Sequence, residues 1–391
     1  MATLCPIPQP PTFPFLGNIT LVDLEVPLRS FFLLAEQYGE VYHLVLGGSE
    51  IVLHANFISI ARQVSNDALY RKSFSRSLRE GRLLAGDGLF TVDSDEPNWE
   101  IAHRILMPAF SEVRSMFPEM RDICSQMLLK WERFGTQLTF DPSDDYTRLT
   151  FDALALCSMS YRFNSFYERD MPDFTRRMSD FLTMSSRSGY RPAFAKLIPM
   201  YYKKEDQKNF KDAQHMTEVA RKTIKQRREQ PTEKPDLLNL MLEGKDPKTG
   251  AQLTEENIIF NLLTFLIAGH ETTSGLLTFT TYYLLKNSAC LQKSREELDE
   301  KLGPAEPTVD DLGKLLYLTA VLHELLRLWP TVPARSIVPK QDVELVGGDG
   351  DPSNPNKQTI CDQEGPDYLP AHRYCASRPT CLGRRRRSLP S

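Results

Sequence analysis

Residues 255–286 form a long apolar stretch that small and polar residues interrupt in its middle. Apolar side chains dominate residues 258–267 and 275–277, and the sequence A-G-H-E-T-T-S occupies residues 268–274 between them. A glycine in a helix interior costs about 1 kcal/mol relative to alanine, and a buried polar group is costly unless it is paired or serves a purpose. The stretch therefore predicts a buried helix that passes close to a large flat ligand. A glycine and threonine kink in an ordinary core helix is the alternative that this motif alone leaves open.

The size and the charge of the chain limit the number of its domains and the kinds of partner that it can bind. The 391 residues, of which 41% are hydrophobic, suffice for a sizeable core in one large domain or two. The net charge of −4 gives no nucleic-acid footprint, and we expect Arg384–Arg387 to be a solvated tail. Because His270, Glu271 and Asn261 interrupt the apolar stretch, we expect a core helix and no transmembrane anchor.

The N-terminus and the cysteines indicate a cytoplasmic protein. No basic segment followed by an apolar one opens the chain, so we expect no secretory signal. The seven cysteines show no paired spacing, and reduced thiols are the expectation without a secretory signal.

Helical periodicity dominates the rest of the chain and predicts a mainly α fold with a small β portion. Glycines at 47 and 48 between two alternating segments, 40–46 and 50–54, predict a β-hairpin. Thr254 is the expected N-cap of the long helix. The predicted helices are residues 28–38, 97–110, 113–135, 147–160, 171–186, 206–229, 234–243, 255–286 and 315–328.

The composition changes after residue 346. Only 11 of the 45 residues from 347 to 391 are apolar, and six are prolines. Such segments rarely bury enough surface to become ordered. We therefore expect a folded body at residues 1–346 and a disordered tail at 347–391 that does not pack on it.

Two shorter motifs carry polar groups on one helix face. Glu324 and Arg327 are three residues apart and can pair; their apolar neighbours predict a buried pair that needs further partners. Trp99 and His103 are four residues apart, with Arg104 adjacent, so one face offers an indole N–H, an imidazole and a cation. This face suits a carboxylate, and a packed tryptophan on an ordinary amphipathic helix is the alternative.

The three motifs W-x-x-x-H, A-G-x-E-T-T and E-x-x-R, in this order, resemble the cytochrome P-450 family. Residues 85–91, 161–166 and 266–277 are similar to its fatty-acid hydroxylases whose haem domain is fused to a flavin reductase. The resemblance covers about residues 6–346. It implies a helical haem domain that binds a fatty-acid-like molecule and hydroxylates it. It also implies electrons from NADPH through FAD and FMN of a reductase that this chain does not contain.

The resemblance also implies roles for single residues. Trp99 and His103 would contact the haem propionates, and Phe90 would lie over the haem and limit the substrate's approach. Glu324 and Arg327 would be structural. Four residues of the long helix would line the oxygen pocket: Ala268, Gly269, Glu271 and Thr272. Of these, Thr272 and Glu271 would be catalytic, with the Thr272 hydroxyl helping to deliver protons.

The chain departs from the family in the cysteine that ligates the haem iron. The family's loop F-x-x-G-x-R-x-C-x-G does not occur, and Cys381 with Gly383 matches only its last step. Tyr374, Ser377 and Pro379 stand where phenylalanine, glycine and arginine belong. We therefore predict no metal ligand and a haem domain incomplete at its C-terminus, through a change of coding frame near residue 347.

Two consequences follow for the function. The chain as printed is expected to be inactive, and the alternative is a haem-free helical remnant that binds lipid or has no activity. The resemblance implies a cation and a phenol near this hairpin that grip the fatty-acid carboxylate, but the predicted hairpin has no basic residue at 49–53. This departure indicates a different carboxylate anchor or a different substrate.

Overall fold

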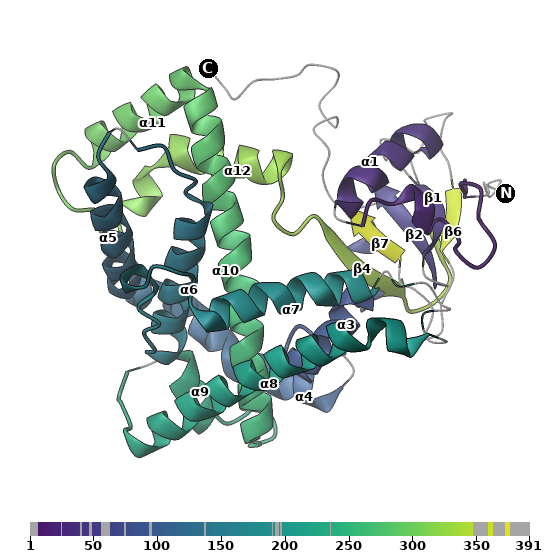
Figure 1. Ribbon diagram of the computed structural model, residues 1–391, viewed down its shortest axis with the longest axis horizontal. Coiled ribbons are helices and arrows are strands. Elements are labelled where there is room, and N and C mark those ends of the chain that lie inside the picture. The colour runs from purple at the N-terminus through teal and green to yellow at the C-terminus, as the bar shows by residue number, and fades with distance from the viewer. Residues whose placement is uncertain are drawn as a thin grey trace. The chain divides into compact units, whose positions relative to one another are not determined.

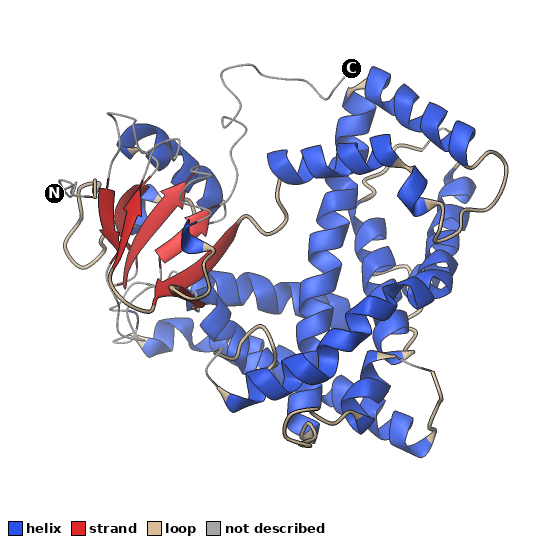
Figure 2. Ribbon diagram, turned by 180° about the vertical axis from the view of Figure 1, so that it is seen from behind, coloured by secondary structure: helices blue, strands red, loops and turns tan. Residues whose placement is uncertain are grey.

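The computed structural model divides the chain into two compact units, each described by itself. The helical unit comprises Leu84–Ser179, Asp212–Thr331 and Arg386–Ser391, and the strand unit comprises Met1–Leu83, Asp180–Lys211 and Val332–Arg385. Figure 2 shows the strands gathered in one unit and the long helices of the other. The structure describes residues 7–24, 26–39, 41–46, 49–55, 63–73, 76–93, 96–136, 138–189, 191, 195, 198–234, 236–346, 359–362 and 372–375.

The helical unit is built around α10 (Glu255–Lys286), which runs through it from end to end (Figure 1). Helix α10 packs against α6 (Ser143–Met159) above all, and also against α9, α11 and α12. Leu262, Leu263 and Leu266 of α10 are buried, as expected of the apolar run. The remaining helices wholly in this unit are α4 (Pro97–Leu106), α5 (Phe117–Phe134), α9 (Leu237–Glu243), α11 (Ser288–Lys301) and α12 (Leu316–Leu328).

In the described part of this unit, 3-10 helices connect the α-helices at Met107–Met116, Ser165–Tyr167 and Leu312–Lys314. Three α-helices have residues in both units: α3 (Arg76–Ala85), α7 (Asp173–Gly189) and α8 (Pro199–Glu229).

The strand unit contains a five-stranded sheet in the order β1-β2-β7-β4-β3. Strands β1 and β2 form an antiparallel hairpin in which Val41 is opposite His54, β7 joins β2 in parallel, and β4 pairs antiparallel with β7 and β3. A separate antiparallel pair joins β5 and β6. The bounds are β1 (Val41–Leu46), β2 (Ser49–Ala55), β3 (Tyr70–Lys72), β4 (Ala334–Pro339), β5 (Val343–Val346), β6 (Thr359–Asp362) and β7 (His372–Cys375).

Strand β1 of the hairpin is covered by a helix. Helix α1 (Pro27–Tyr38) packs on β1, where Phe31 and Leu34 join Tyr42 and Leu44 in one buried cluster. The Tyr42 hydroxyl donates to the Phe31 carbonyl at 2.6 Å, so the helix and the strand are joined by a buried hydrogen bond as well as by apolar contact.

The structure confirms the mainly α fold with a small β portion, the hairpin and the long helix with its bounds. Thr254 caps α10, because its Oγ1 accepts the backbone N–H of Asn257 at 3.2 Å. The predicted helix 97–110 is wrong at its end: α4 stops at Leu106 and a 3-10 helix follows. Pro108 explains the change, since a proline supplies no backbone N–H to an α-helix.

Two helices were missed, and the expectation for the C-terminal tail is wrong in part. Helix α11 carries too few apolar residues for a clear periodic pattern, and only its Cys290 and Ser294 are buried. Helix α3 is amphipathic but has only ten residues. Residues 359–362 and 372–375 form strands that pair with the body, although we expected the region to be disordered. Strand pairing uses backbone groups, so an apolar count does not reveal it. The rest of 347–391 lies outside the described residues.

Among the helices that the structure describes, none combines the length and the apolar character needed to cross a membrane.

Candidate functional site

The middle of α10 has two different faces, and one of them packs on α6. A Cβ on Gly269 would lie 2.6 Å from Cδ2 of Leu154, so the glycine allows the two helices to approach closely. Thr150 of α6 donates to the His270 carbonyl at 3.0 Å, and the Phe151 ring stands edge-on to the His270 ring at 5.4 Å. The sequence predicted a flat ligand close to this part of the helix, but the space that the missing Cβ of Gly269 leaves is filled by Leu154.

His270 is fully buried on this face, and burial favours its neutral form. Its Nδ1 lies 2.6 Å from the Leu266 carbonyl oxygen, which accepts from it when Nδ1 carries the proton. Burial lowers the pKa of His270, although the Leu266 hydrogen bond and the nearby Glu271 carboxylate act in the opposite direction. With the proton on Nδ1, Nε2 is a buried acceptor; it has no hydrogen-bond partner among the described residues, and Glu271 Oε1 lies 4.0 Å away.

The other face of α10 carries Ala268, Thr272 and Glu271. Ala268 and Thr272 are four residues apart and share a side of the helix, and the Thr272 hydroxyl donates to the Ala268 carbonyl at 2.8 Å. The two lone pairs of this hydroxyl remain able to accept a hydrogen bond. The Glu271 side chain is 49% exposed, so its carboxylate is in contact with water.

The predicted carboxylate-binding face of α4 is present without its cation. The Trp99 and His103 rings stack with their centroids 4.8 Å apart and an angle of 24° between their planes. Arg104 is engaged elsewhere: its Nε and one terminal nitrogen donate to the two carboxylate oxygens of Asp246 at 2.6 and 2.9 Å. The other nitrogen donates to Glu100 at 2.7 Å. Our expectation that Arg104 adds a cation to this face is thus wrong.

Asp246 is the partner that sequence reasoning missed. Its side chain is fully buried, and its hydrogen bond to Arg104 is the main reason why its pKa lies far below the usual range. Asp246 also accepts from Thr249 at 2.5 Å and from the Lys248 N–H at 3.2 Å. The turn before α10 is therefore attached to α4 by a charge-assisted pair of parallel hydrogen bonds, which is a strong type of contact.

Phe90 lies in a turn of residues 86–92 between α3 and α4, with about half of its surface exposed. The Thr91 hydroxyl donates to the Ala85 and Gly86 carbonyls at 3.0 and 2.8 Å. Asn261 of α10 accepts the Leu89 N–H at 3.0 Å. The turn is thus held both from within and by the long helix.

Glu324 and Arg327 form the predicted pair on α12, with two hydrogen bonds of 2.6 and 2.7 Å. Their side chains are 20% and 32% exposed, so the pair is partly buried where we expected full burial. The hydrogen bond to Glu324 raises the pKa of Arg327.

Comparison with known proteins decides the family. The cytochrome P450 family model matches residues 7–349, close to the change of composition after residue 346. The chain belongs to the cytochrome P450 family. It is 48% identical over 356 residues to the self-sufficient cytochrome P450 monooxygenase CYP505E3 of Phanerodontia chrysosporium, covering 90% of this chain and 33% of that protein.

Two further relatives give the same result. Identity is 41% over 374 residues with the self-sufficient cytochrome P450 monooxygenase CYP505U2 of Exserohilum turcicum, covering 93% of this chain and 35% of the relative. It is 42% over 337 residues with a bifunctional cytochrome P450/NADPH–P450 reductase of Aspergillus oryzae, covering 85% and 30%. This P450 chain spans about a third of the length of the relatives that it matches.

The donors of α4 fit the haem that the P450 family implies. The Trp99 indole nitrogen and the His103 ring nitrogens form no hydrogen bond with any described residue, and both rings are partly buried on one face. A pair of nitrogen donors in such a setting suits the carboxylates of a haem.

The three cysteines in the helical unit of this P450, Cys124, Cys157 and Cys290, fit poorly as ligands of the haem iron. Cys157 and Cys290 are buried, and burial raises the pKa of Cys157 to about 11 and also raises that of the half-buried Cys124. A thiol with a raised pKa is a poor source of the thiolate that binds iron. Cys361 and Cys375 lie in strands β6 and β7 of the strand unit, while residues 5 and 381 lie outside the described residues.

The described residues also contain no group of three or more histidines, cysteines or acidic residues that could hold a metal ion. The structure thus offers groups that fit the haem carboxylates.

Proposed function

We propose that this chain carries part of the haem site of a cytoplasmic monooxygenase that hydroxylates fatty acids. In this proposal electrons come from NADPH through the FAD and FMN of a reductase. The observation that carries it is the stacked Trp99–His103 pair in a chain of the P450 family. The reductase is supported by the names of the relatives, of which one is a bifunctional P450 and NADPH–P450 reductase.

Haem with a thiolate ligand, when bound, would supply the activation of oxygen. The chain's own residues would do the rest. Trp99 and His103 would donate to the haem carboxylates and so orient the ring. Thr272 holds a proton at Oγ1, which it now donates to the Ala268 carbonyl, and the exposed Glu271 can take a proton from water.

The apolar residues of α10 would exclude water from the reacting site. Phe90, half exposed on its turn, would limit which carbon of the substrate approaches. Ala268, on the same side of α10 as Thr272, would line the pocket, and Gly269 lets α10 pack closely on α6.

Haem titration tests the role of α4. Replacing Trp99 by Phe or His103 by Ala removes one donor to a charged carboxylate, which weakens binding by about 10- to 100-fold. His323→Ala, an exposed histidine on α12, is the matched control and should leave the affinity unchanged. Equal affinities in all four proteins would contradict the proposed contact between α4 and haem.

We further propose that the chain as printed does not hold haem through a thiolate and has no turnover. The support is the absence of the family's cysteine loop from the sequence and the raised pKa of Cys124 and Cys157. The reduced carbon monoxide difference spectrum should lack the thiolate-type Soret band. A strong band that disappears on Cys381→Ala would overturn this part of the proposal.

The proton delivery assigned to Thr272 can be tested in a chain extended with a cysteine loop of the family pattern. Thr272→Ala should raise the peroxide formed per NADPH oxidised, because the hydroxyl that moves protons is gone. Thr273→Ala removes the exposed neighbouring hydroxyl and is the control. Unchanged coupling in Thr272→Ala would mean that the hydroxyl only packs within the helix.

A further inference from the structure

We propose that Asn261 is a positioning residue that fixes the turn at residues 86–92 and so determines where Phe90 presents its ring to the substrate. The inference rests on the proposed function, because it takes the fatty-acid site to lie at Phe90. Asn261 itself would touch neither substrate nor cofactor. It would act on specificity through the backbone of Leu89, the residue next to Phe90.

The side chain of Asn261 is fully buried in the apolar half of α10 and is nearly saturated with hydrogen bonds. Its Oδ1 accepts the Leu89 N–H at 3.0 Å. Its Nδ2 donates to the backbone carbonyl and to Oδ1 of Asn257, each at 2.8 Å. With both hydrogens and one oxygen lone pair in use, the amide has a single orientation. A buried network that is satisfied in this way is rigid.

Asn257 extends the network to a third element. This residue is also buried, and its Nδ2 donates to Oδ1 and to the backbone carbonyl of Asp87 at 3.0 and 3.3 Å. The second carboxylate oxygen of Asp87 accepts from Asn98, which precedes Trp99 on α4. The amides of α10 therefore connect the turn that carries Phe90 with the start of the helix that carries Trp99.

Two glycines keep the turn close to α10. Gly86 has a positive φ of 43°, and a Cβ there would collide with the Phe260 ring. A Cβ on Gly88 would lie 2.5 Å from Thr264 Oγ1 and 2.9 Å from the Phe260 carbonyl oxygen. The turn thus lies directly against the helix backbone. In this proposal the bond from Leu89 to Asn261 fixes the backbone next to Phe90, and its loss frees that backbone while the Thr91 and Asn257 bonds still hold the rest of the turn.

Hydrogen–deuterium exchange on the full chain tests the positioning. Asn261→Leu keeps the burial but removes the acceptor, so the Leu89 amide should exchange about tenfold faster. Thr264→Val is the matched control: Thr264 is buried on α10 three residues later, and its Oγ1 has no hydrogen-bond partner among the described residues. This control should leave exchange at 85–92 unchanged. Equal acceleration along all of α10 in Asn261→Leu would show a general packing role and overturn the proposal.

A second variant keeps the test valid if Asn261→Leu does not fold. Asn261→Ser places a hydroxyl that can bond within the helix but is too short to reach Leu89. The Leu89 amide should again exchange about tenfold faster than in the wild-type chain. Wild-type exchange at Leu89 in this variant would also overturn the proposal.

Binding of dodecanoate to the same full chain tests whether Asn261 acts through Phe90. Asn261→Leu should weaken binding several-fold, and this effect should vanish when Phe90 is already replaced by Ala. If Asn261→Leu weakens dodecanoate binding by the same factor with and without Phe90→Ala, the proposal is overturned. If the wild-type chain binds no dodecanoate, the fatty-acid assignment fails, and the exchange experiment alone decides whether Asn261 positions the turn.

Discussion

The two halves of α10 have similar apolar sequences but different surroundings. In the first half Leu263 is fully buried, and Asn257 and Asn261 connect the helix to a turn more than 160 residues earlier in the chain. In the second half Leu285 is 70% exposed and Tyr282 is half exposed. An apolar sequence thus predicts that a helix forms and that it is at least partly buried. Which part of the helix is buried depends on the elements that pack against it.

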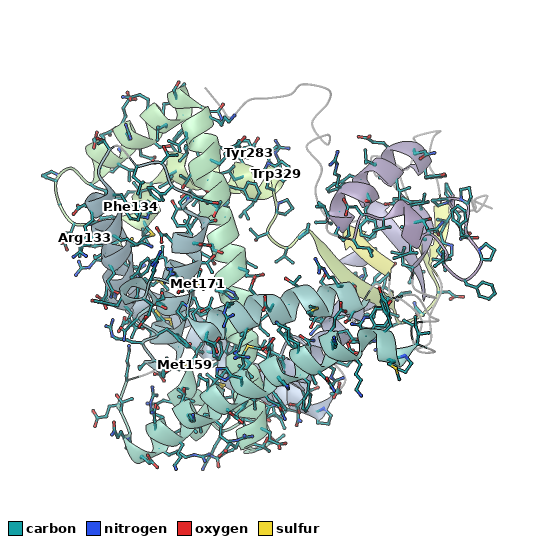
Figure 3. The ribbon with its side chains drawn as sticks, viewed as in Figure 1. Arg133, Phe134, Met159, Met171, Tyr283 and Trp329 are labelled. Carbon is teal, nitrogen blue, oxygen red and sulfur yellow. The ribbon has the colours of Figure 1, made fainter. Side chains whose placement is uncertain are left out.

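The second half still has specific contacts on two sides. Tyr146 of α6 and Thr281 share a hydrogen bond of 2.6 Å. The Phe279 ring stacks parallel to the Trp329 ring. The Trp329 indole donates to the Tyr283 hydroxyl at 2.5 Å, and Figure 3 labels Trp329 and Tyr283. Aromatic side chains with polar tips thus replace the aliphatic packing of the first half.

The largest expected effect comes from truncating one leucine in each half. Leu263→Ala should lower the free energy of unfolding by about 2–5 kcal/mol, because it removes a buried side chain and leaves a cavity. Leu285→Ala should change it by no more than about 0.5 kcal/mol, since that side chain is mostly in water. Urea unfolding followed by circular dichroism measures both. Similar losses would mean that Leu285 is covered and that the contrast between the halves is false.

Replacing a glycine by alanine should lower the stability of the protein at one site and raise it at another. Gly86→Ala strains a positive φ and meets the Phe260 ring of the first half, so it should destabilise the protein by about 1–3 kcal/mol. Gly275→Ala in the second half meets nothing closer than Thr331 Cγ2 at 3.9 Å. Helix propensity then favours alanine by about 0.5–1 kcal/mol. Thermal unfolding should show a lower midpoint for the first variant and a higher one for the second.

His270, between the two halves, predicts a dependence of stability on pH. Burial lowers its pKa in the folded state, so the unfolded chain binds the proton more readily. The free energy of unfolding should fall as the pH drops through about 6.5, by at most about 1.4 kcal/mol per pH unit, until the folded pKa is reached. Urea unfolding at several pH values measures the slope. If His270→Leu has the slope of the wild-type chain, His270 is not the group responsible.

The smallest effect is expected for the aromatic contact of the second half. Tyr283→Phe removes the acceptor of the Trp329 indole, but Trp329 is half exposed and water can replace the lost bond. The cost should be below about 1 kcal/mol, with a shift in tryptophan emission as the readout. Tyr282→Phe, at the exposed neighbouring residue, is the control and should leave the emission unchanged. A loss as large as that of Leu263→Ala would place this contact in a buried core.

Much of the helical architecture was predictable because its signals are local. The α10 bounds, the Thr254 cap and the β1–β2 hairpin follow from periodicity, capping chemistry and two turn glycines. The order of three motifs also indicated the family that the comparison confirmed. Local signals failed where polar composition hid an element, as in α11 and in strands β6 and β7.

The candidate site was predictable in its residue types but not in its contacts. The stacked pair of Trp99 and His103 follows from a four-residue spacing, which places two side chains on one helix face whatever surrounds them. The partner of Arg104 lies 142 residues away at Asp246, and nothing local points to it.

The sequence by itself determined the helices, the hairpin and the likeness to a family, because these depend on hydrogen bonds and side-chain spacings within a few residues. Only the tertiary structure decided that Gly269 makes room for Leu154 and that Asn261 holds Leu89 from 172 residues away. Such contacts depend on which helices pack together, and packing is a property of the whole chain. The same polar residue in an apolar run can therefore interrupt a helix, face a ligand or position a distant turn.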